Sequence, residues 1–563
     1  MPKPAGRFET VAEAYLALLK SRGIDWLFAN AGTDFAPIIE ALARGRKAGI
    51  AMPEAVPIAH ETVAVAMAHG YWLLTGRPQA VMVHVNVGTA NALMGLINAA
   101  RDHVPMLFTS GRTPITEQRR HGSRDLPIHW GQEMFDQAGM LREFVKWDYE
   151  LRYAEQVQAA VDRAMALAMS EPMGPVYLSL PREVLAEPWP NVAVSQRPTV
   201  AAARAAHPDP EAVGHAADML KAAERPLIIA GRSDAAAFAA LTAFAEQTAI
   251  PVVHFWPGRL AVPTDHPFHA GFDLTPWIEQ ADAILALDMM VPWLPDRHKL
   301  ASGARVIHIG PSPGFGEVPM RSFPATLSLS ANVAAALAQL GAAMGAASAQ
   351  RREAVLAAIA DHRRRRAKKL ARTKGDGLTN TAISRIIDEH KGQDAIVFGE
   401  LGCDASVMTF TRADGYFGHP IAGGLGWGLP AALGAKLACP DRLVIACVGD
   451  GSYMFANPVA CHHTAAALDL PILTIVFNNE VWNAVRRSTL TLYPDGHAAA
   501  ANEMPLSSLA PSPDYEKVVE ASGGWGIRVE DAAELERALA KAIGMVQREK
   551  RQALINVRCA ISR

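Results

Sequence analysis

The sequence lacks long apolar runs, paired cysteines and a strong net charge. No uninterrupted apolar stretch reaches the roughly eighteen residues that a membrane-spanning helix requires. Lysine and arginine total 54 against 56 aspartate and glutamate, so the formal net charge of −2 offers no broad electrostatic surface to nucleic acid or to an anionic membrane. We therefore expect no nucleic-acid and no membrane partner, and a small molecule is the expected ligand.

We also expect neither disulfides nor an export signal. The cysteines show no paired spacing and one would be left over, which fits a reducing compartment. All five lie in the last third of the chain: Cys403, Cys439, Cys447, Cys461 and Cys559. Residues 1–19 carry scattered charges and have the pattern of an amphipathic helix. We therefore expect a cytoplasmic protein.

What the sequence does contain is a regular alternation of short apolar segments and alanine-rich helical patterns. Apolar segments of this kind, rich in β-branched residues, indicate buried parallel strands. They form three groups of four, at 26–32, 80–86, 105–111 and 174–181, then 225–231, 250–256, 281–288 and 304–310, then 394–400, 442–450, 470–479 and 553–560. The length of 563 residues suits about three domains. The pattern predicts an α/β fold of three consecutive doubly wound parallel-sheet domains.

The segments between these groups set the predicted domain limits. A proline-containing stretch at 187–210 has the composition of a linker, and a basic helical pattern covers about 348–374. We predict domains at 1–191, 192–345 and 379–563, with a helical linker at 346–378. The run RRRR at 363–366 is typical of a nucleic-acid patch or of a solvated linker helix, and the near-neutral net charge favours the linker.

The strongest chemical signal is the segment Gly449-Asp450-Gly451-Ser452 at the end of one apolar segment, with Asn478-Asn479 ending the next. In an open α/β sheet, ligands bind at the carboxyl ends of strands, so a carboxylate and a carboxamide are expected to converge there. Mg²⁺ prefers such oxygen ligands together with substrate phosphates. A lone Gly-Asp-Gly would indicate only a turn, but the second strand end favours a magnesium and diphosphate site.

These motifs resemble the thiamine-diphosphate-dependent enzymes, in the group of acetolactate synthase and benzoylformate decarboxylase. The family signature is GDG followed by NN after a second strand, and the interval here is slightly longer than usual. The resemblance implies that Mg²⁺ is bound by Asp450, Asn479 and the carbonyl of Val481. It implies that these residues bind thiamine diphosphate: Gly402, Cys403, Gly423, Leu425, Gly449, Gly451 and Ser452.

Two residues are expected to act on the cofactor itself. Leu425 lies in the segment 422–434, which resembles the family segment beside the pyrimidine ring, where a bulky apolar side chain bends the cofactor. Ordinary core packing is the alternative, and the surrounding glycines disfavour it. Glu61 begins a small-residue helix and resembles the family's catalytic glutamate, which exchanges a proton with the pyrimidine ring. The alternative for Glu61 is an acidic first-turn residue that stabilises its helix.

Substrate contacts rest on the same resemblance. The segment 78–99 is similar to benzoylformate decarboxylase, in which a histidine at the position of His84 relays protons; a hydrogen-bonded structural histidine is the alternative. Thr33 matches a serine that contacts substrate in that relative, although a threonine there also suits a helix N-cap. Further implied substrate contacts are Gln132, Gln137 and His266.

The resemblance covers essentially the whole chain and implies pyrimidine-binding, central and diphosphate-binding domains in that order. It implies decarboxylation of 2-oxo acids, acyloin carboligation with an aldehyde acceptor, or both. Relatives build each active site between two chains, so a homodimer or homotetramer with shared active sites is expected. FAD is not expected, because the central segment lacks the glycine and arginine pattern of flavin binding.

Two other classes of protein remain open. A catalytically silent structural or regulatory relative would keep the fold, but the joint presence of Glu61, Leu425, Asp450 and Asn479 disfavours it. A nucleotide-binding protein is disfavoured because the chain lacks both a Walker-type lysine motif and a G-x-G-x-x-G fingerprint.

Overall fold

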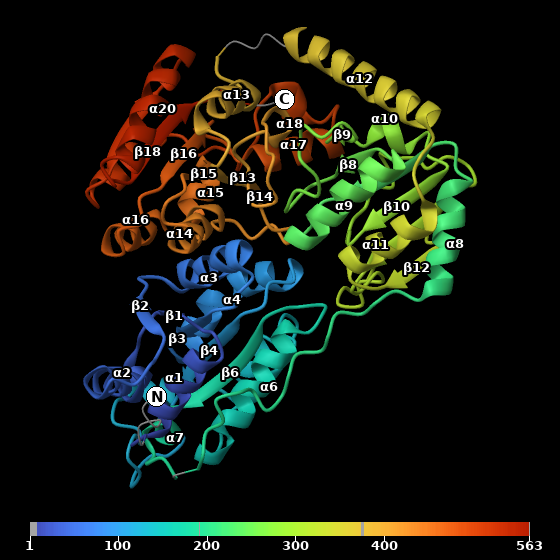
Figure 1. The fold of residues 1–563 in the computed structure, drawn as a ribbon. Helices are drawn as coiled ribbons and strands as arrows, with labels where there is room; N and C mark the ends of the chain where they lie inside the picture. Colours follow the sequence, from blue (N-terminus) through green and yellow to red (C-terminus); the bar gives the residue numbers. More distant parts are fainter. Residues whose placement is uncertain (1–7, 191, 373–376, 562–563) are drawn as a thin grey trace.

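The computed structural model describes residues 8–190, 192–372 and 377–561. Three six-stranded sheets follow one another along the chain, and helices connect their strands (Figure 1). Within each sheet the paired strands are parallel, as the buried apolar segments predicted. The α/β fold of three consecutive doubly wound parallel-sheet domains is confirmed.

The first sheet has the strand order β2-β1-β3-β4-β6-β5. Its inner strands are apolar and buried, whereas the outer strand β5 is half-buried throughout. The strands are β1 (Trp26–Ala29), β2 (Glu54–Pro57), β3 (Ala80–Val83), β4 (Leu107–Arg112), β5 (Asp148–Glu150) and β6 (Val176–Pro181). The helices are α1 (Val11–Ser21), η1 (Thr33–Phe35), α2 (Ala36–Ala48), α3 (Glu61–Thr75), α4 (Val85–Arg101), α5 (Ile128–Gly131), η2 (Ala138–Met140), η3 (Ala154–Gln156), α6 (Val157–Met169) and α7 (Arg182–Ala186).

The central sheet has the order β12-β11-β10-β7-β8-β9 and its own hydrophobic core. Its long helices begin where an Asp or Asn side chain accepts a hydrogen bond from the first turn, as at Asp234 and Asn332. The strands are β7 (Pro226–Ala230), β8 (Val252–His254), β9 (His269–Gly271), β10 (Ala283–Leu287), β11 (Arg305–Gly310) and β12 (Leu327–Ser330). The helices are α8 (Pro210–Lys221), α9 (Ala235–Thr248), α10 (Thr275–Ile278), α11 (Val333–Met344) and the following α12 (Ala349–Arg372).

The last sheet has the order β14-β13-β15-β16-β18-β17, which places β13, β15 and β16 side by side at its centre. The strands are β13 (Ile396–Glu400), β14 (Tyr416–Gly418), β15 (Val444–Gly449), β16 (Leu473–Asn478), β17 (Trp525–Val529) and β18 (Ala553–Arg558). The helices are α13 (Asn380–Lys391), η4 (Ala405–Val407), α14 (Gly428–Ala438), α15 (Asp450–Phe455), α16 (Pro458–Ala467), α17 (Asn483–Leu492), α18 (His497–Ala501), α19 (Tyr515–Glu520) and α20 (Ala532–Gln547).

The predicted domain limits stay predictions. Residues 1–7, 191 and 373–376 lie outside the described residues, and the limit at 191 and part of the 346–378 linker fall on them. Within the described residues, α12 fills most of that linker segment. None of the described helices combines the length and apolar composition that crossing a membrane demands.

The most extensive helix contact between domains joins α3 of the first domain to α14 of the last. A Cβ on Gly70 would lie 1.9 Å from the carbonyl oxygen of Ala431, and one on Gly434 would lie 2.0 Å from that of Met67. The two backbones therefore touch, and only glycine allows it. Because Met67 faces Gly434 while Gly70 faces Ala431, the helices run in opposite directions. The first and last domains share one hydrophobic core across this contact.

Candidate active site

The structure brings the predicted metal ligands together at the carboxyl edge of the last sheet. Asp450 directly follows β15 and Asn479 directly follows β16, and these strands pair in register with Gly449 beside Phe477. One carboxylate oxygen of Asp450 accepts a hydrogen bond from the Glu480 amide at 2.7 Å, and the other accepts one from the Gly451 amide at 2.9 Å. The two chain turns that carry the candidate ligands are thus tied to each other.

The chemistry of this donor set fits a hard cation. Asp450 is 3% exposed, and burial raises the pKa of its carboxyl, while the backbone hydrogen bonds oppose that rise. A bound cation would supply the missing positive charge. The side-chain oxygen of Asn479 accepts from the Val481 amide at 3.0 Å, and the carbonyl of Val481 accepts from the Asn483 amide at 2.8 Å. The oxygens of Asn479 and Val481 each keep a second lone pair. Together with the Asp450 carboxylate they are oxygen ligands of the type that Mg²⁺ prefers.

The residues predicted to contact the diphosphate surround this edge. Gly449 ends β15, and the buried Ser452 lies in the first turn of α15. A Cβ on Gly451 would lie 2.1 Å from the ring of Trp482, and one on Gly402 would lie 2.7 Å from the backbone of Cys447. The need for glycine at these two positions therefore comes from packing within the chain itself.

The cofactor loop 423–428, which carries Leu425, is held from two sides. Glu400, the last residue of β13, accepts hydrogen bonds of 2.6 Å from the amides of Gly426 and Gly428. Asn98 of α4 accepts from the Gly424 amide at 3.1 Å and donates to its carbonyl at 2.9 Å. Leu425 itself is half-buried. Strand β13 and helix α4 therefore fix the position of the loop.

Glu400 and Asn98 were not predicted from the sequence. Burial raises the pKa of Glu400 to about 7, even though the two amide hydrogen bonds favour the charged form. A glutamate that ends an apolar strand is a signal that sequence inspection could have found, because strand ends at this edge face ligands. The role of Asn98 depends on a contact 326 residues away in sequence and carried no local signal.

Glu61 begins α3 as predicted, with the side chain of His60 capping the helix by accepting from the Thr62 amide. It is 8% exposed, and Asn91 of α4 donates to its carboxylate at 3.2 Å. Within the same chain, Asn91 and the Asn98 that binds Gly424 are seven residues apart on α4, which is about 10 Å at 1.5 Å per helical residue. A gap of this order therefore separates Glu61 from the loop that carries Leu425.

His84 lies at the carboxyl end of β3 and belongs to a second cluster in the first domain. Its Nδ1 is 2.5 Å from a carboxylate oxygen of the buried Asp34, and its Nε2 is 3.2 Å from the amide nitrogen of Gln132. Because a carboxylate only accepts, Nδ1 carries the proton and Nε2 accepts from Gln132. Cβ atoms on Gly32 and Gly111 would overlap His84 and Asp34, at 2.1 Å and 1.7 Å. Asp34 was not predicted.

The other predicted substrate contacts differ in their surroundings. Thr33 opens η1 without capping it, and its hydroxyl is 3.4 Å from Nε2 of His129. Gln137 donates to Ser110, Gly111 and Tyr177 at 2.8–2.9 Å, which ties its amide to the framework of the first domain. His266 lies in the central domain, where its Nε2 is 3.5 Å from Glu246. Within one chain it does not meet the other predicted residues.

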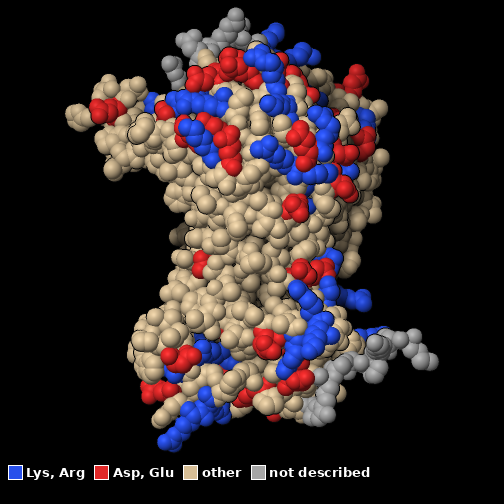
Figure 2. Space-filling model, turned by 90° about the vertical axis from the view of Figure 1, so that its left-hand side faces the viewer, with Lys and Arg blue, Asp and Glu red and all other residues tan. Residues whose placement is uncertain are grey.

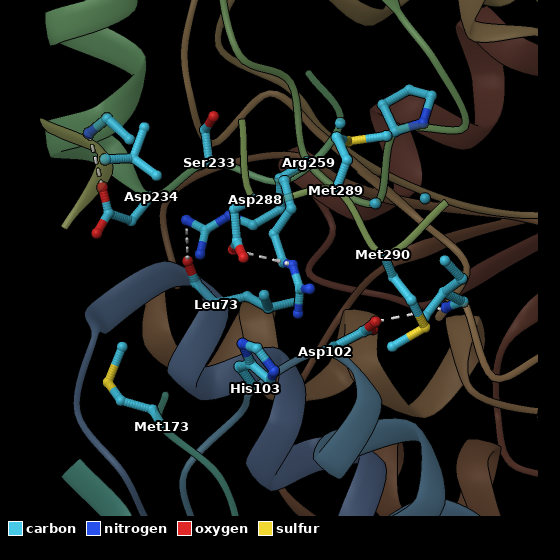
Figure 3. A pocket seen from close by; sticks show the side chains of 18 of the residues that line it. Leu73, Asp102, His103, Met173, Ser233, Asp234, Arg259, Asp288, Met289 and Met290 are labelled. Carbon is cyan, nitrogen blue, oxygen red and sulfur yellow. Dashed lines mark hydrogen bonds and ion pairs between the residues drawn. The ribbon is translucent and has the colours of Figure 1, made fainter. Parts of the chain in front are cut away.

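A separate cavity of about 260 Å³ lies where the three domains meet. Figure 3 shows Asp102 and His103 of the first domain facing Arg259 and Asp288 of the central domain. Burial raises the pKa of Asp102 to about 6, and the guanidinium of Arg259 lies 5.7 Å from the ring centre of Trp72. None of the residues predicted to bind cofactor, metal or substrate lines this cavity.

Three family models match the chain. The N-terminal TPP binding domain of thiamine pyrophosphate enzymes matches residues 9–140, the central domain matches 213–340, and the C-terminal TPP binding domain matches 400–557.

Several relatives match over nearly the same length. A probable 2-ketoarginine decarboxylase of Pseudomonas aeruginosa is 28% identical over 97% of this chain and 94% of its own. The benzoylformate decarboxylase of the same organism is 28% identical over 85% of this chain and 87% of its own. The structure of a thiamine diphosphate-dependent 4-hydroxybenzoylformate decarboxylase of Rhodococcus jostii RHA1 superposes with a TM-score of 0.75 and 25% identity, over 98% and 99% of the two chains.

Proposed function

Since this chain belongs to the thiamine pyrophosphate enzyme family, we propose that it breaks the carbon–carbon bond beside the carbonyl of 2-oxo acids, using thiamine diphosphate and Mg²⁺. The observation that carries this proposal is the position of Asp450 and Asn479 at the ends of two neighbouring strands. The decarboxylases among the relatives support 2-oxo acids as the substrate class. After carbon dioxide leaves, the remaining fragment of the 2-oxo acid is either protonated to an aldehyde or joined to an aldehyde acceptor as an acyloin.

The proposed roles follow from position. Asp450, Asn479 and the carbonyl of Val481 would hold Mg²⁺, since they are the oxygen donors at the two strand ends. When bound, thiamine diphosphate supplies an electron sink that accepts the electron pair left by carbon dioxide. The diphosphate would be bound by Gly402, Cys403, Gly449, Gly451 and Ser452, and the pyrimidine ring by Gly423 and Leu425.

Two residues of the first domain would move protons. Glu61, buried at the start of α3, would exchange a proton with the pyrimidine ring. His84 would donate or accept a proton at the substrate through Nε2, because Asp34 keeps the proton of the ring on Nδ1. Thr33 and Gln132, which lie in the same region of the first domain, would orient the substrate. Gln137 and His266 are kept as weaker substrate candidates.

A shared site in a homodimer or homotetramer is part of the proposal. It is supported by the character of the surface next to the cofactor loop. Figure 2 shows the side on which α14 and α16 lie in Figure 1, and charged side chains there gather at the two ends and are sparse across the middle. Next to the cofactor loop, Met454, Phe455 and Val459 are 45%, 54% and 68% exposed. A sparsely charged face with exposed apolar side chains suits burial against a second copy.

A reducing cytoplasm is the proposed location. The five cysteines are all unpaired in the structure, which supports a compartment where disulfides do not form.

The test measures carbon dioxide and acyloin formation from a panel of 2-oxo acids, with and without an added aldehyde, after loading with thiamine diphosphate and Mg²⁺. We expect turnover of at least one donor, its loss after chelation of the metal, and recovery when Mg²⁺ is restored. Glu61→Gln and Asp450→Asn should each lower kcat at least about hundredfold. The control Glu530→Gln, an exposed partner of Arg528, should leave activity unchanged.

The same experiment decides between this proposal and a catalytically silent structural or regulatory relative. A silent relative would turn over no donor. The enzyme proposal is wrong if no donor reacts and if thiamine diphosphate with Mg²⁺ does not raise the melting temperature. The ratio of aldehyde to acyloin then separates decarboxylase from carboligase activity.

A further inference from the structure

Helix α12 lies against both the central domain and the last domain, and its basic run is divided between two sides. Arg364 and Arg365 point to solvent, with side chains 67% and 70% exposed, and both pair with Asp361. Arg363 points the other way and donates to backbone carbonyls of the central domain at 2.9 and 3.0 Å. Arg366 donates to the carbonyl of Ser406 in the last domain at 2.8 Å. The prediction of a solvated helix therefore describes only half of this run.

Arg363 and Arg366 line a cavity of about 340 Å³. The central domain contributes strand β9 with flanking residues, and the last domain contributes Arg385 of α13 and residues 406–409. The volume is within the range of pockets that hold small metabolites. None of the residues assigned to the proposed active site lines this cavity.

The charges around this cavity are unbalanced. Arg363, Arg366 and Arg385 line it, and Asp265 is the only carboxylate that the described part of the chain contributes to the lining. Among the described residues, no ion pair joins any of the three arginines to a carboxylate; Arg363 and Arg366 bind only neutral oxygens. An anion in the cavity would supply the missing negative charge, and guanidinium groups form their strongest hydrogen bonds with oxyanions.

Two histidines in the cavity lining have a buried nitrogen without a hydrogen-bond partner. His269 is 4% exposed, and its Nε2 has no hydrogen-bond partner; Nε2 of His362 is likewise buried and without a partner. Burial lowers the pKa of His269 to about 4, and the positive charges of Arg363 and Arg366 add to that effect. A negative charge nearby would reduce the cost of protonating these rings.

We propose that the cavity between α12, the central domain and the last domain binds a small phosphate ester. Phosphate fits better than a carboxylate because the three guanidinium groups come from two helices, and a tetrahedral phosphate offers oxygens in three directions while a carboxylate offers two in one plane. The volume exceeds that of a bare phosphate and leaves room for a short organic group, against which Phe272, Leu370 and Val407 provide apolar wall.

This ligand site is physically connected to the proposed cofactor site. Helix α13 carries Arg385 into the cavity, and Asn380 in its first turn donates to the carbonyl of Gly402 at 2.8 Å. Ser406, which Arg366 contacts, lies three residues after Cys403. Occupancy of the cavity therefore stiffens the segment that leads to Gly402 and Cys403, and bound phosphate ester should change the affinity for thiamine diphosphate.

The test uses the full chain with thiamine diphosphate and Mg²⁺ already present, so that added phosphate does not enter the proposed cofactor site. Calorimetric titration and thermal shift are measured with glycerol 3-phosphate, inorganic phosphate and succinate at constant ionic strength. We expect saturable binding that is tightest for glycerol 3-phosphate and a melting temperature that rises with its concentration. Tighter binding of succinate than of either phosphate would overturn the phosphate assignment.

Matched double variants locate the binding. Arg363→Gln with Arg366→Gln should weaken the binding of glycerol 3-phosphate at least about tenfold, because charge-assisted hydrogen bonds to the phosphate are lost from two side chains. Arg364→Gln with Arg365→Gln removes the same charge from the same turn of α12 and should leave the affinity unchanged. Arg385→Gln tests the third arginine separately, and because this side chain is exposed the substitution should not disturb the fold. Equal effects of both double variants, or no saturable binding of any probe, would overturn the site.

Discussion

At the scale of single residues, the contact between Asp34 and His84 explains how one histidine keeps a defined tautomer. Asp34 is 2% exposed, and its second carboxylate oxygen lies 3.4 Å from the amide of Val85, the residue after His84. Val85 has a φ of 29°, which is unusual for a β-branched residue. Asp34 therefore positions both the ring and the backbone that carries it.

Replacing Asp34 by Asn tests this positioning role. The amide keeps the size of the side chain but no longer requires a proton on Nδ1 of His84, so both tautomers become populated. We expect kcat to fall roughly ten- to hundredfold and the pH profile of kcat to shift, while KM for the donor changes little. Glu9→Gln, an exposed partner of Arg44, is the control and should change neither quantity. An unaltered pH profile in Asp34→Asn would contradict the positioning role.

Glu400 gives a prediction for the pH dependence of stability. Its pKa rises on folding from 4.5 to about 7, so the folded state binds a proton that the unfolded state has released. This contribution to stability is complete below pH 4.5 and is lost as the pH rises through 7. The loss is on the order of 3 kcal/mol.

Glu400→Gln removes that titration but also one acceptor for the Gly426 and Gly428 amides. The variant should therefore be less stable than the wild type at pH 5, and the difference should shrink as the pH rises to 8. Melting temperatures of the cofactor-free proteins, measured at several pH values in that range, give this difference. A difference that stays constant with pH would show that Glu400 ionises normally in the folded protein.

Residues of the candidate site differed in how far the sequence could identify them. Asp450, Asn479 and Glu61 stand at strand or helix ends, where local pattern is informative, and the structure places them there. Asp34 and Asn98 act through contacts with segments far away in sequence, which no local pattern reports. The grouping of Glu61 with Leu425 around one cofactor stays a prediction.

At the scale of elements, the sequence predicted the four inner strands of every sheet and missed the two outer ones. The inner strands, such as β15, are continuous buried apolar runs. The outer strands are short or partly exposed: none of the residues of β5 is buried, β17 has a single buried residue, and β14 is buried but only three residues long. An edge strand has only one neighbour and is not buried on both faces, so it carries no long apolar run to recognise.

The crossing of α3 and α14 predicts a large effect of a single methyl group. In Gly70→Ala the new Cβ would lie 1.9 Å from the carbonyl oxygen of Ala431, so the helices must move apart. Overpacking of this kind costs about 1–3 kcal/mol. The melting temperature should fall by roughly 2–4 °C for each kcal/mol in a domain of this size.

A matched substitution lies in α8. Gly214 is inside that helix, and a Cβ there would meet nothing within 4 Å. Gly214→Ala should leave the melting temperature unchanged or raise it, because alanine favours the helix by up to about 1 kcal/mol. Equal melting temperatures for Gly70→Ala and the wild type would mean that the two helices do not touch in solution.

At the scale of the whole molecule, an active site shared between two chains predicts complementation between inactive subunits. Glu61→Gln damages the first domain's part of a shared site, and Asp450→Asn damages the last domain's part. In a mixed dimer one site carries both substitutions and the other carries neither. Random exchange of subunits should therefore restore about a quarter of the wild-type activity.

The experiment unfolds and refolds the two variants together and compares their activity with that of each variant refolded alone. Native mass spectrometry of the mixture, with one variant carrying a mass tag, verifies that mixed oligomers form. Mixed oligomers without activity would show that each site is built from one chain.

The direct packing of α3 on α14 has a consequence for how such a chain changes over evolutionary time. The first and last domains share a core, and they carry every residue assigned to cofactor and metal, while the central domain keeps a core of its own. Substitutions that reshape the middle third therefore leave the reacting groups in place. New ligand preferences and new forms of regulation can therefore arise in the central domain, while the first and last domains keep the same reaction chemistry.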